Sequence, residues 1–271
     1  MSPERNEPCT CGTVSTDPVA LNREAAYAGD IGCRRRQFCL DYTLYKKATL
    51  TQGENMLREM VASRGDTISC RKGCPKCCRL YVTATLQEAE CITYFLYQHE
   101  TVLQHFITAY RDWERALGLF DHKRLDQAMA RNLAGELSAR EIEQLGLQIN
   151  DYTRRRISCP FLLDNACSIY ELRPFVCAGV VAVTPTEMCT FDGTGINQAR
   201  YCRIDFDPRQ DMPYFLQARA RNHLVFGCMP ELVHRIVKEG YSFLATIDGL
   251  EEFRQQDAAR CESARPAAAA G

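Results

Sequence analysis

A short stretch of the chain, SCRKGCPKCCRL, places four thiol groups within nine positions, at Cys70, Cys74, Cys77 and Cys78. Thiolates are the ligands that zinc sites and iron–sulfur clusters prefer. Cys74 and Cys77 form a C-x-x-C pair, which is half of a typical site. A short segment that carries several ligands loses little entropy when they converge. The stretch therefore predicts a metal site or a redox site.

A second cysteine-rich stretch, SCPFLLDNACSIYELRPFVCAGVVAVTPTEMC, supplies further ligands. It contains Cys159, Cys167, Cys177 and Cys189. The two stretches bracket about 80 residues with a helical pattern. They can meet only if the helices between them fold back as a hairpin, and we expect them to do so around a shared metal centre.

The adjacent cysteines, Cys77 and Cys78, limit the kind of centre. Neighbouring side chains tend to diverge, so both thiolates cannot easily bind one tetrahedral ion. Two metals, a multinuclear centre, or one ligand with one bystander remain open.

Charged and polar residues accompany the thiols. Several thiolates leave negative charge on a zinc ion or a [4Fe–4S] cluster, and nearby cations can offset it. The candidate cations are Arg71, Lys72, Lys76, Arg79 and Arg173. Tyr170 and Glu171, close to Cys167, are candidates for an acid or base beside the metal.

The first three cysteines also have the C-x₃-C-x₂-C spacing of radical S-adenosylmethionine enzymes, in which three cysteines hold a [4Fe–4S] cluster. Those enzymes need a barrel of alternating strands and helices, whereas this chain has one helical pattern after another. The spacing therefore favours a [4Fe–4S] cluster with an open iron but not that fold.

Composition narrows the class of protein. The chain has 271 residues, with 33 Lys and Arg against 34 Asp and Glu, which gives a net charge of -1. Because there is no excess of basic residues, the composition does not indicate binding to nucleic acid or to an anionic membrane. No apolar run approaches the ~20 residues of a membrane span, and the first residues lack the apolar core of a secretory signal. We expect a soluble, cytoplasmic protein, in which 16 cysteines indicate metal binding or redox chemistry.

The hydrophobic pattern predicts a mainly α fold with little β structure. The expected helices cover residues 17–28, 53–63, 85–117 with a break near Glu100, 121–133, 138–156, 211–226, 230–239 and 246–256. The first ~40 residues are expected to be irregular apart from the short helix over 17–28, and AGVVAV is expected to form the only clear strand. The expected domains are an N-terminal extension with short helices over 1–65, a cysteine-cluster domain over 66–200, C-terminal helices over 201–260 and a disordered tail over 261–271.

The two cysteine stretches together resemble the YkgJ family, the CxxCxxCC proteins described as zinc- or iron-chelating, which include flagellin lysine N-methylases. The resemblance covers roughly residues 66–192. It implies a helical domain in which all eight cysteines named above gather metal. Two departures are visible: the first gap between cysteines is three residues where the family has two, and Ala178 stands where family members usually have Arg.

These observations favour an iron–sulfur or multinuclear iron protein that modifies a protein or small-molecule substrate, by group transfer such as methylation or by redox chemistry. S-adenosylmethionine is a candidate co-substrate. The alternative is a non-enzymatic zinc- or iron-binding module with a structural or metal-handling role. Two arginine runs, residues 34–36 and 154–156, are either sites for an anionic group or solvated surface.

Other cysteines have less defined roles. Cys91, among apolar neighbours, is expected to be a buried small hydrophobe. The sequence assigns no role to Cys9, Cys11, Cys33, Cys39, Cys202 or Cys228, although the first four are open to a second metal site or a loosely bound arm. His223 is expected on a helix surface, and Cys261 is expected to be a bystander.

Overall fold

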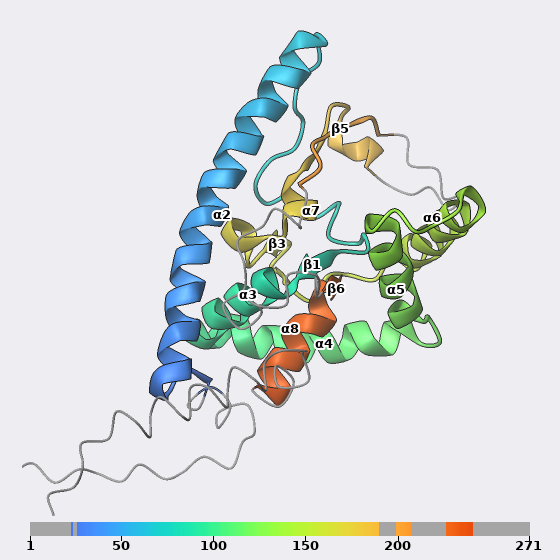
Figure 1. Ribbon diagram of the computed structural model, residues 1–271. Helices are drawn as coiled ribbons and strands as arrows, with labels where there is room; N and C mark the ends of the chain where they lie inside the picture. The colour runs from blue at the N-terminus through green and yellow to red at the C-terminus, as the bar shows by residue number, and fades with distance from the viewer. Residues whose placement is uncertain (1–22, 24–25, 190–198, 207–225, 241–271) are drawn as a thin grey trace, which may run out of the picture.

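The computed structural model describes residues 23, 26–189, 199–206 and 226–240. The main helices are α2 (Gly29–Ser63), α3 (Leu86–Gln98), α4 (Glu100–Leu117), α5 (His122–Leu133), α6 (Ala139–Arg154) and α8 (Met229–Glu239). Short helical turns are η1 (Tyr170–Leu172), α7 (Phe175–Ala178) and η2 (Thr186–Met188). The fold is mainly α, as predicted (Figure 1).

Three small antiparallel pairs of strands complete the described part. They are β1 (Thr83–Thr85) with β6 (Phe226–Cys228), β2 (Leu162–Leu163) with β3 (Ala166–Cys167), and β4 (Val180–Ala182) with β5 (Tyr201–Arg203). The predicted strand AGVVAV contains β4, but it is not the only strand, so that part of the prediction is wrong. The β1–β6 pair joins Thr83 to Cys228, a long-range pairing that local patterns do not reveal.

The long helix α2 is the largest departure from the predicted elements. Residues 32–40, expected to be irregular, are helical, and the helix predicted over 53–63 is the end of a 35-residue helix. Two buried ion pairs attach α2 to α3: Arg35 Nη2 lies 2.5 Å from Glu90 Oε1, and Lys46 Nζ lies 2.9 Å from Glu88 Oε1. Such pairs form only in the folded chain, so local sequence could not predict this helix.

The helices α3 and α4 follow the prediction. The Thr85 hydroxyl accepts from the Glu88 N–H while the Glu88 carboxylate accepts from the Thr85 N–H, a complete capping box. The predicted break lies at His99, one residue from the expected Glu100. A second capping box, formed by Ser138 and Glu141, begins α6.

Predictions at the C-terminal end have mixed outcomes. The helix predicted over residues 230–239 is confirmed as α8. Of the helix predicted over 211–226, only Phe226 is described, and it begins the strand β6. The helix predicted over 246–256, the tail, and most of the helix over 17–28 lie outside the described residues. No described helix is both long enough and apolar enough to span a membrane.

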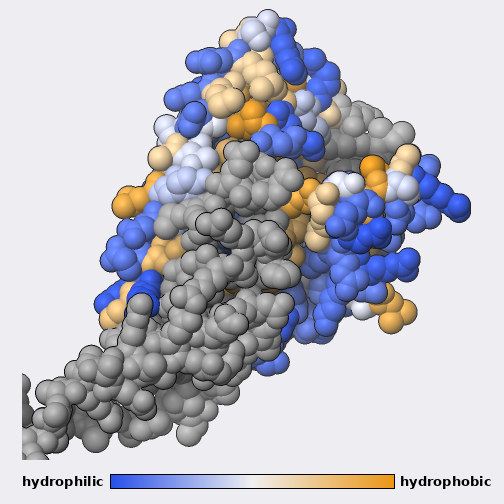
Figure 2. All heavy atoms as spheres, viewed as in Figure 1, coloured by the Kyte–Doolittle hydropathy of each residue, from blue (hydrophilic) through white to orange (hydrophobic). Residues whose placement is uncertain are grey.

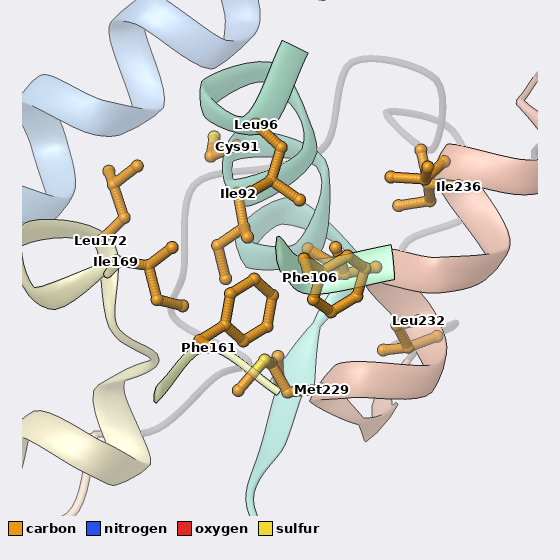
Figure 3. Packing of buried hydrophobic residues seen from close by; sticks show 14 of the residues in the cluster. Cys91, Ile92, Leu96, Phe106, Phe161, Ile169, Leu172, Met229, Leu232 and Ile236 are labelled. Carbon is orange, nitrogen blue, oxygen red and sulfur yellow. The ribbon is translucent and has the colours of Figure 1, made fainter. Parts of the chain in front are cut away.

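One large apolar core lies between α3, α4 and α8, and the second cysteine stretch contributes to it. Phe161, Ile169 and Leu172 point into the same space as Ile92 of α3 and Ile236 of α8 (Figure 3). Polar residues cover much of the described surface in the view of Figure 2. The apolar residues between the cysteines therefore anchor the second stretch to the helical core.

Candidate metal centre

The two cysteine stretches meet in the structure, as the hairpin model predicted. The Cys159 N–H donates a 2.7 Å hydrogen bond to the carbonyl of Cys78, and the Ser69 N–H donates one of 2.9 Å to the carbonyl of Ala182. The second bond attaches the start of the first stretch to β4. The α3–α6 segment therefore folds back and brings Cys78 and Cys159, which are 81 positions apart, into direct contact.

Tight turns arrange the first stretch. The N–H groups of Cys74 and Cys78 donate to the carbonyls of Arg71 and Pro75, over 3.2 and 3.1 Å. Gly73 has a φ of 87°, a left-handed conformation that favours glycine. Successive turns present thiols repeatedly to one side of this segment.

A hairpin and a short helix arrange the second stretch. Asp164 and Asn165 have φ values of 50° and 61°, which fit the two central positions of a type I′ turn between β2 and β3. The predicted tight turn in LLDNAC is confirmed, and it places Cys167 on β3. Pro174 precedes α7, which carries Cys177.

Seven of the eight predicted cysteine ligands line one cavity of about 250 Å³. They are Cys70, Cys74, Cys77, Cys78, Cys159, Cys167 and Cys177. The eighth, Cys189, lines a neighbouring cavity. Cys189 nevertheless lies near Cys70, whose pKa is raised by burial, lowered by the Ala182 N–H, and raised by the thiolates of Cys77 and Cys189.

The thiols of Cys77 and Cys78 do not diverge, so that expectation is wrong. A hydrogen bond from the Cys78 thiol lowers the pKa of Cys77 to about 6, with Arg173 contributing in the same direction. The same hydrogen bond raises the pKa of Cys78. The adjacent thiols therefore face one cavity as a donor–acceptor pair.

Mutual effects on pKa indicate two groups of thiols that share Cys77. Burial, followed by the thiolates of Cys159, Cys77 and Cys167, raises the pKa of Cys177. Burial also raises the pKa of Cys159, to about 12. The first group contains Cys177, Cys159, Cys167 and Cys77. The second group contains Cys70, Cys74, Cys189 and Cys77. A donor set of this size exceeds the four ligands of one tetrahedral ion.

The predicted cations divide between two sides of the first stretch. Arg71, Lys72 and Arg173 line the cysteine cavity, whereas Lys76 and Arg79 line the neighbouring cavity. Only the first three are therefore placed to offset thiolate charge within the cysteine cavity.

Of the two other candidate residues near the thiols, Tyr170 lines the cavity and Glu171 does not. The Arg173 guanidinium lies 3.9 Å from the centre of the Tyr170 ring. Glu171 instead pairs with Lys72, its Oε1 lying 2.7 Å from Lys72 Nζ. Arg173 also reaches Glu54 of α2 at 3.4 Å.

A buried carboxylate that the ligand prediction missed supports Cys177. Glu88 Oε1 accepts from Lys46 Nζ over 2.9 Å and from the Phe175 N–H, the first residue of α7, over 2.8 Å. Lys46 Nζ also donates to the carbonyl of Leu172 over 3.1 Å. The capping box identified Glu88 in the sequence, but its contact with α7 needed the tertiary structure.

Most of the remaining described cysteines are packing residues. Cys39, Cys91, Cys202 and Cys228 are buried, and Cys33 is exposed. The expectation for Cys91 is confirmed, and Cys39 is its direct neighbour, because the Cys91 thiol donates to the Cys39 carbonyl over 3.7 Å. Cys33 and Cys39 therefore lie in different environments on α2. Cys9, Cys11, His223 and Cys261 lie outside the described residues.

The thiols of the cysteine cavity are ligands that a soft metal prefers, but they are not arranged at coordination distance around one ion. Within residues 26–189, 199–206 and 226–240, no three His, Cys, Asp or Glu side chains are grouped closely enough to hold one metal ion as they stand. The seven thiols of the cavity thus surround a common space but do not converge on one point.

Comparison with family models gives a match that covers both cysteine stretches. Residues 69–203 match the model of the family CxxCxxCC, described as "Putative zinc- or iron-chelating domain". No curated protein matches the chain, and no solved structure matches it.

Proposed function

Because the chain belongs to the CxxCxxCC family of zinc- or iron-chelating domains, we propose that its cysteine cavity holds an iron–sulfur or other multinuclear iron centre. The proposed ligands are Cys70, Cys74, Cys77, Cys78, Cys159, Cys167, Cys177 and Cys189. The observation that carries the proposal is that seven of them, from two distant stretches, line one cavity.

The size of the donor set favours a multinuclear centre over a single ion. A structural zinc site is closed by four ligands, and this cavity offers more thiols than that. Cys77 raises the pKa of thiols in both groups, so it is the natural residue to connect them. Binding would draw the thiols inward, which couples metal binding to local folding.

The cavity also supports chemistry on a substrate. Arg58, Arg71 and Arg173 line it beside the thiols and can bind an anionic group. The proposed activity is group transfer, such as methylation, or redox modification of a protein or small molecule, with S-adenosylmethionine as a candidate co-substrate. An iron–sulfur centre would supply an open iron or electrons for it.

Metal analysis of anaerobically purified protein tests the proposal. The expected protein is brown and contains iron with acid-labile sulfide. Protein that is colourless and carries zinc alone would contradict an iron centre and would support the alternative, a non-enzymatic zinc module with a structural or metal-handling role.

A pair of cysteine variants tests whether the two stretches share the centre. Serine is nearly isosteric with cysteine but binds soft metals poorly. We expect Cys77→Ser combined with Cys159→Ser to lose most of the bound metal, and Cys91→Ser, a buried cysteine outside the cavity, to keep it. Full metal content in the double variant would refute a shared centre.

A further inference from the structure

The first cysteine stretch has a second face, which lines a separate cavity of about 180 Å³. The thiols of Cys74, Cys77 and Cys78 line the cysteine cavity, while the intervening Pro75, Lys76, Arg79 and Leu80 line the second one. The remaining lining residues are Thr153, Arg156 and Cys189. One segment therefore separates a thiol-lined space from a space lined by cations.

Three cations and no carboxylate line this second cavity. Within the described residues, no ion pair involves Lys76 or Arg79, whereas Lys72 of the same stretch is paired with Glu171. Glu187 lies nearby: its pKa is lowered by its own backbone N–H, by Thr186 and then by the charge of Lys76. The cavity thus concentrates positive charge, and the acidic side chain of Glu187 lies beside it.

The backbone of Arg156 gives an independent reason to assign a function here. Its φ is 54°, in the left-handed region, just after α6 ends. Helices often end with a residue in this conformation, and that residue is usually glycine because a Cβ atom is costly there. Such strain at a non-glycine residue is a reason to look for function, and Arg156 is one of the residues that line the cavity.

We propose that this cavity, lined by Lys76, Arg79 and Arg156, binds the phosphate group of a ligand. Guanidinium groups bind phosphate oxygens with paired hydrogen bonds, and lysine adds a point charge. The volume corresponds to about six water molecules, which accommodates a phosphate group and some of its hydration. Of the proposed metal ligands, Cys189 also lines this cavity, so the site would place a phosphorylated ligand beside the metal centre.

Calorimetric titration of the full chain with inorganic phosphate at constant ionic strength tests the site. We expect saturable binding of one phosphate per chain. Lys76→Gln combined with Arg79→Gln should weaken it at least tenfold, while Arg111→Gln combined with Lys123→Gln, which removes the same charge from exposed positions elsewhere, should leave it unchanged. Equal weakening in both double variants, or no saturable binding to the wild-type chain, would overturn the proposal.

Two further variants separate binding from general charge and from folding. Arg156→Gly should raise the thermal unfolding midpoint, because glycine tolerates the left-handed backbone, and should still weaken phosphate binding. Glu187→Gln should strengthen phosphate binding. Unchanged binding by Arg156→Gly would overturn the role of that guanidinium.

Additional ligands and metal analysis define what the site recognises. Glycerol phosphate binding at least as tightly as inorganic phosphate would support a phosphate monoester as the ligand, and binding of free phosphate alone would support the inorganic ion. Acetate binding as tightly as phosphate would overturn the assignment to phosphate.

Metal content should be unchanged in the double variant Lys76→Gln with Arg79→Gln. Loss of metal in this variant would assign these two cations to the metal centre instead. Failure of phosphate binding with full metal content would leave the proposed metal function intact.

Discussion

The helices α3 and α6 begin with the same motif but use it differently. In each, a hydroxyl residue and a glutamate three positions later form a complete capping box: Thr85 with Glu88, and Ser138 with Glu141. The Glu88 side chain is 4% exposed and that of Glu141 is 38% exposed. The motif determines where a helix starts, and the surroundings determine what else the glutamate does.

Burial turns the α3 cap into a link between the scaffold and the cysteine cavity. One oxygen of Glu88 caps α3, and the other accepts from Lys46 of α2 and from the Phe175 N–H at the start of α7. Glu141 instead pairs with Arg131 at the surface. The same two-residue motif therefore supports Cys177 in one place and only its own helix in the other.

The largest expected effect is on stability when Glu88 is removed. Glu88→Ala deletes the cap and leaves the Lys46 ammonium buried without its carboxylate, and loss of one partner of a buried pair costs roughly 3–5 kcal/mol. Chemical unfolding should show a much smaller loss in the free energy of unfolding for the control Glu141→Ala, because the Glu141–Arg131 pair is exposed. Equal losses in the two variants would mean that burial of the α3 cap has no energetic consequence.

Metal removal should separate the cysteine stretches from the helical core. If binding is coupled to folding, metal at 100 times its Kd stabilises the protein by about 2.7 kcal/mol. Chelation should lower the unfolding midpoint accordingly and speed amide hydrogen exchange in residues 69–80, while exchange in α3 changes little. An unchanged midpoint after complete removal would show that the fold is independent of the site.

A subtler change to Glu88 should weaken metal binding. Glu88→Gln keeps an oxygen that can accept from the Phe175 N–H but loses the charge that holds Lys46. Groups that support metal ligands typically affect affinity by 10–100-fold, and we expect about tenfold here. Competition with a chelator measures it, with Glu141→Gln as the control. Unchanged affinity in both variants would restrict Glu88 to a role in stability.

Several helix boundaries could be predicted because their causes are local. Both capping boxes lie within four consecutive residues, so the sequence alone locates the starts of α3 and α6. The helix α2 could not be predicted in full, because Arg35 meets Glu90 and Lys46 meets Glu88 only after the chain has folded.

The cavity could be predicted in composition but not in geometry. Spacing and residue type identified the seven thiols that line it. The contact between Cys77 and Cys78, the position of Cys189 in the neighbouring cavity and the outward position of Lys76 all depend on turns in the backbone. Sequence spacing does not determine those turns.

The smallest expected effect is the pH dependence of the exposed capping box. Hydrogen bonds from the Ser138 N–H and hydroxyl, and then from Arg131, lower the pKa of Glu141 from its ordinary value near 4.5 to about 2. Because the pKa of Glu141 is lower in the folded state, its ionised carboxylate stabilises the fold fully when the pH is above the ordinary pKa. That stabilisation is lost as the pH falls toward the pKa of the folded state. The wild-type chain should therefore lose slightly more stability than Glu141→Gln between about pH 5 and pH 3, because glutamine does not titrate. Parallel losses in the two proteins over that range would show that the Ser138–Glu141 box acts through hydrogen bonding without a charge-dependent part.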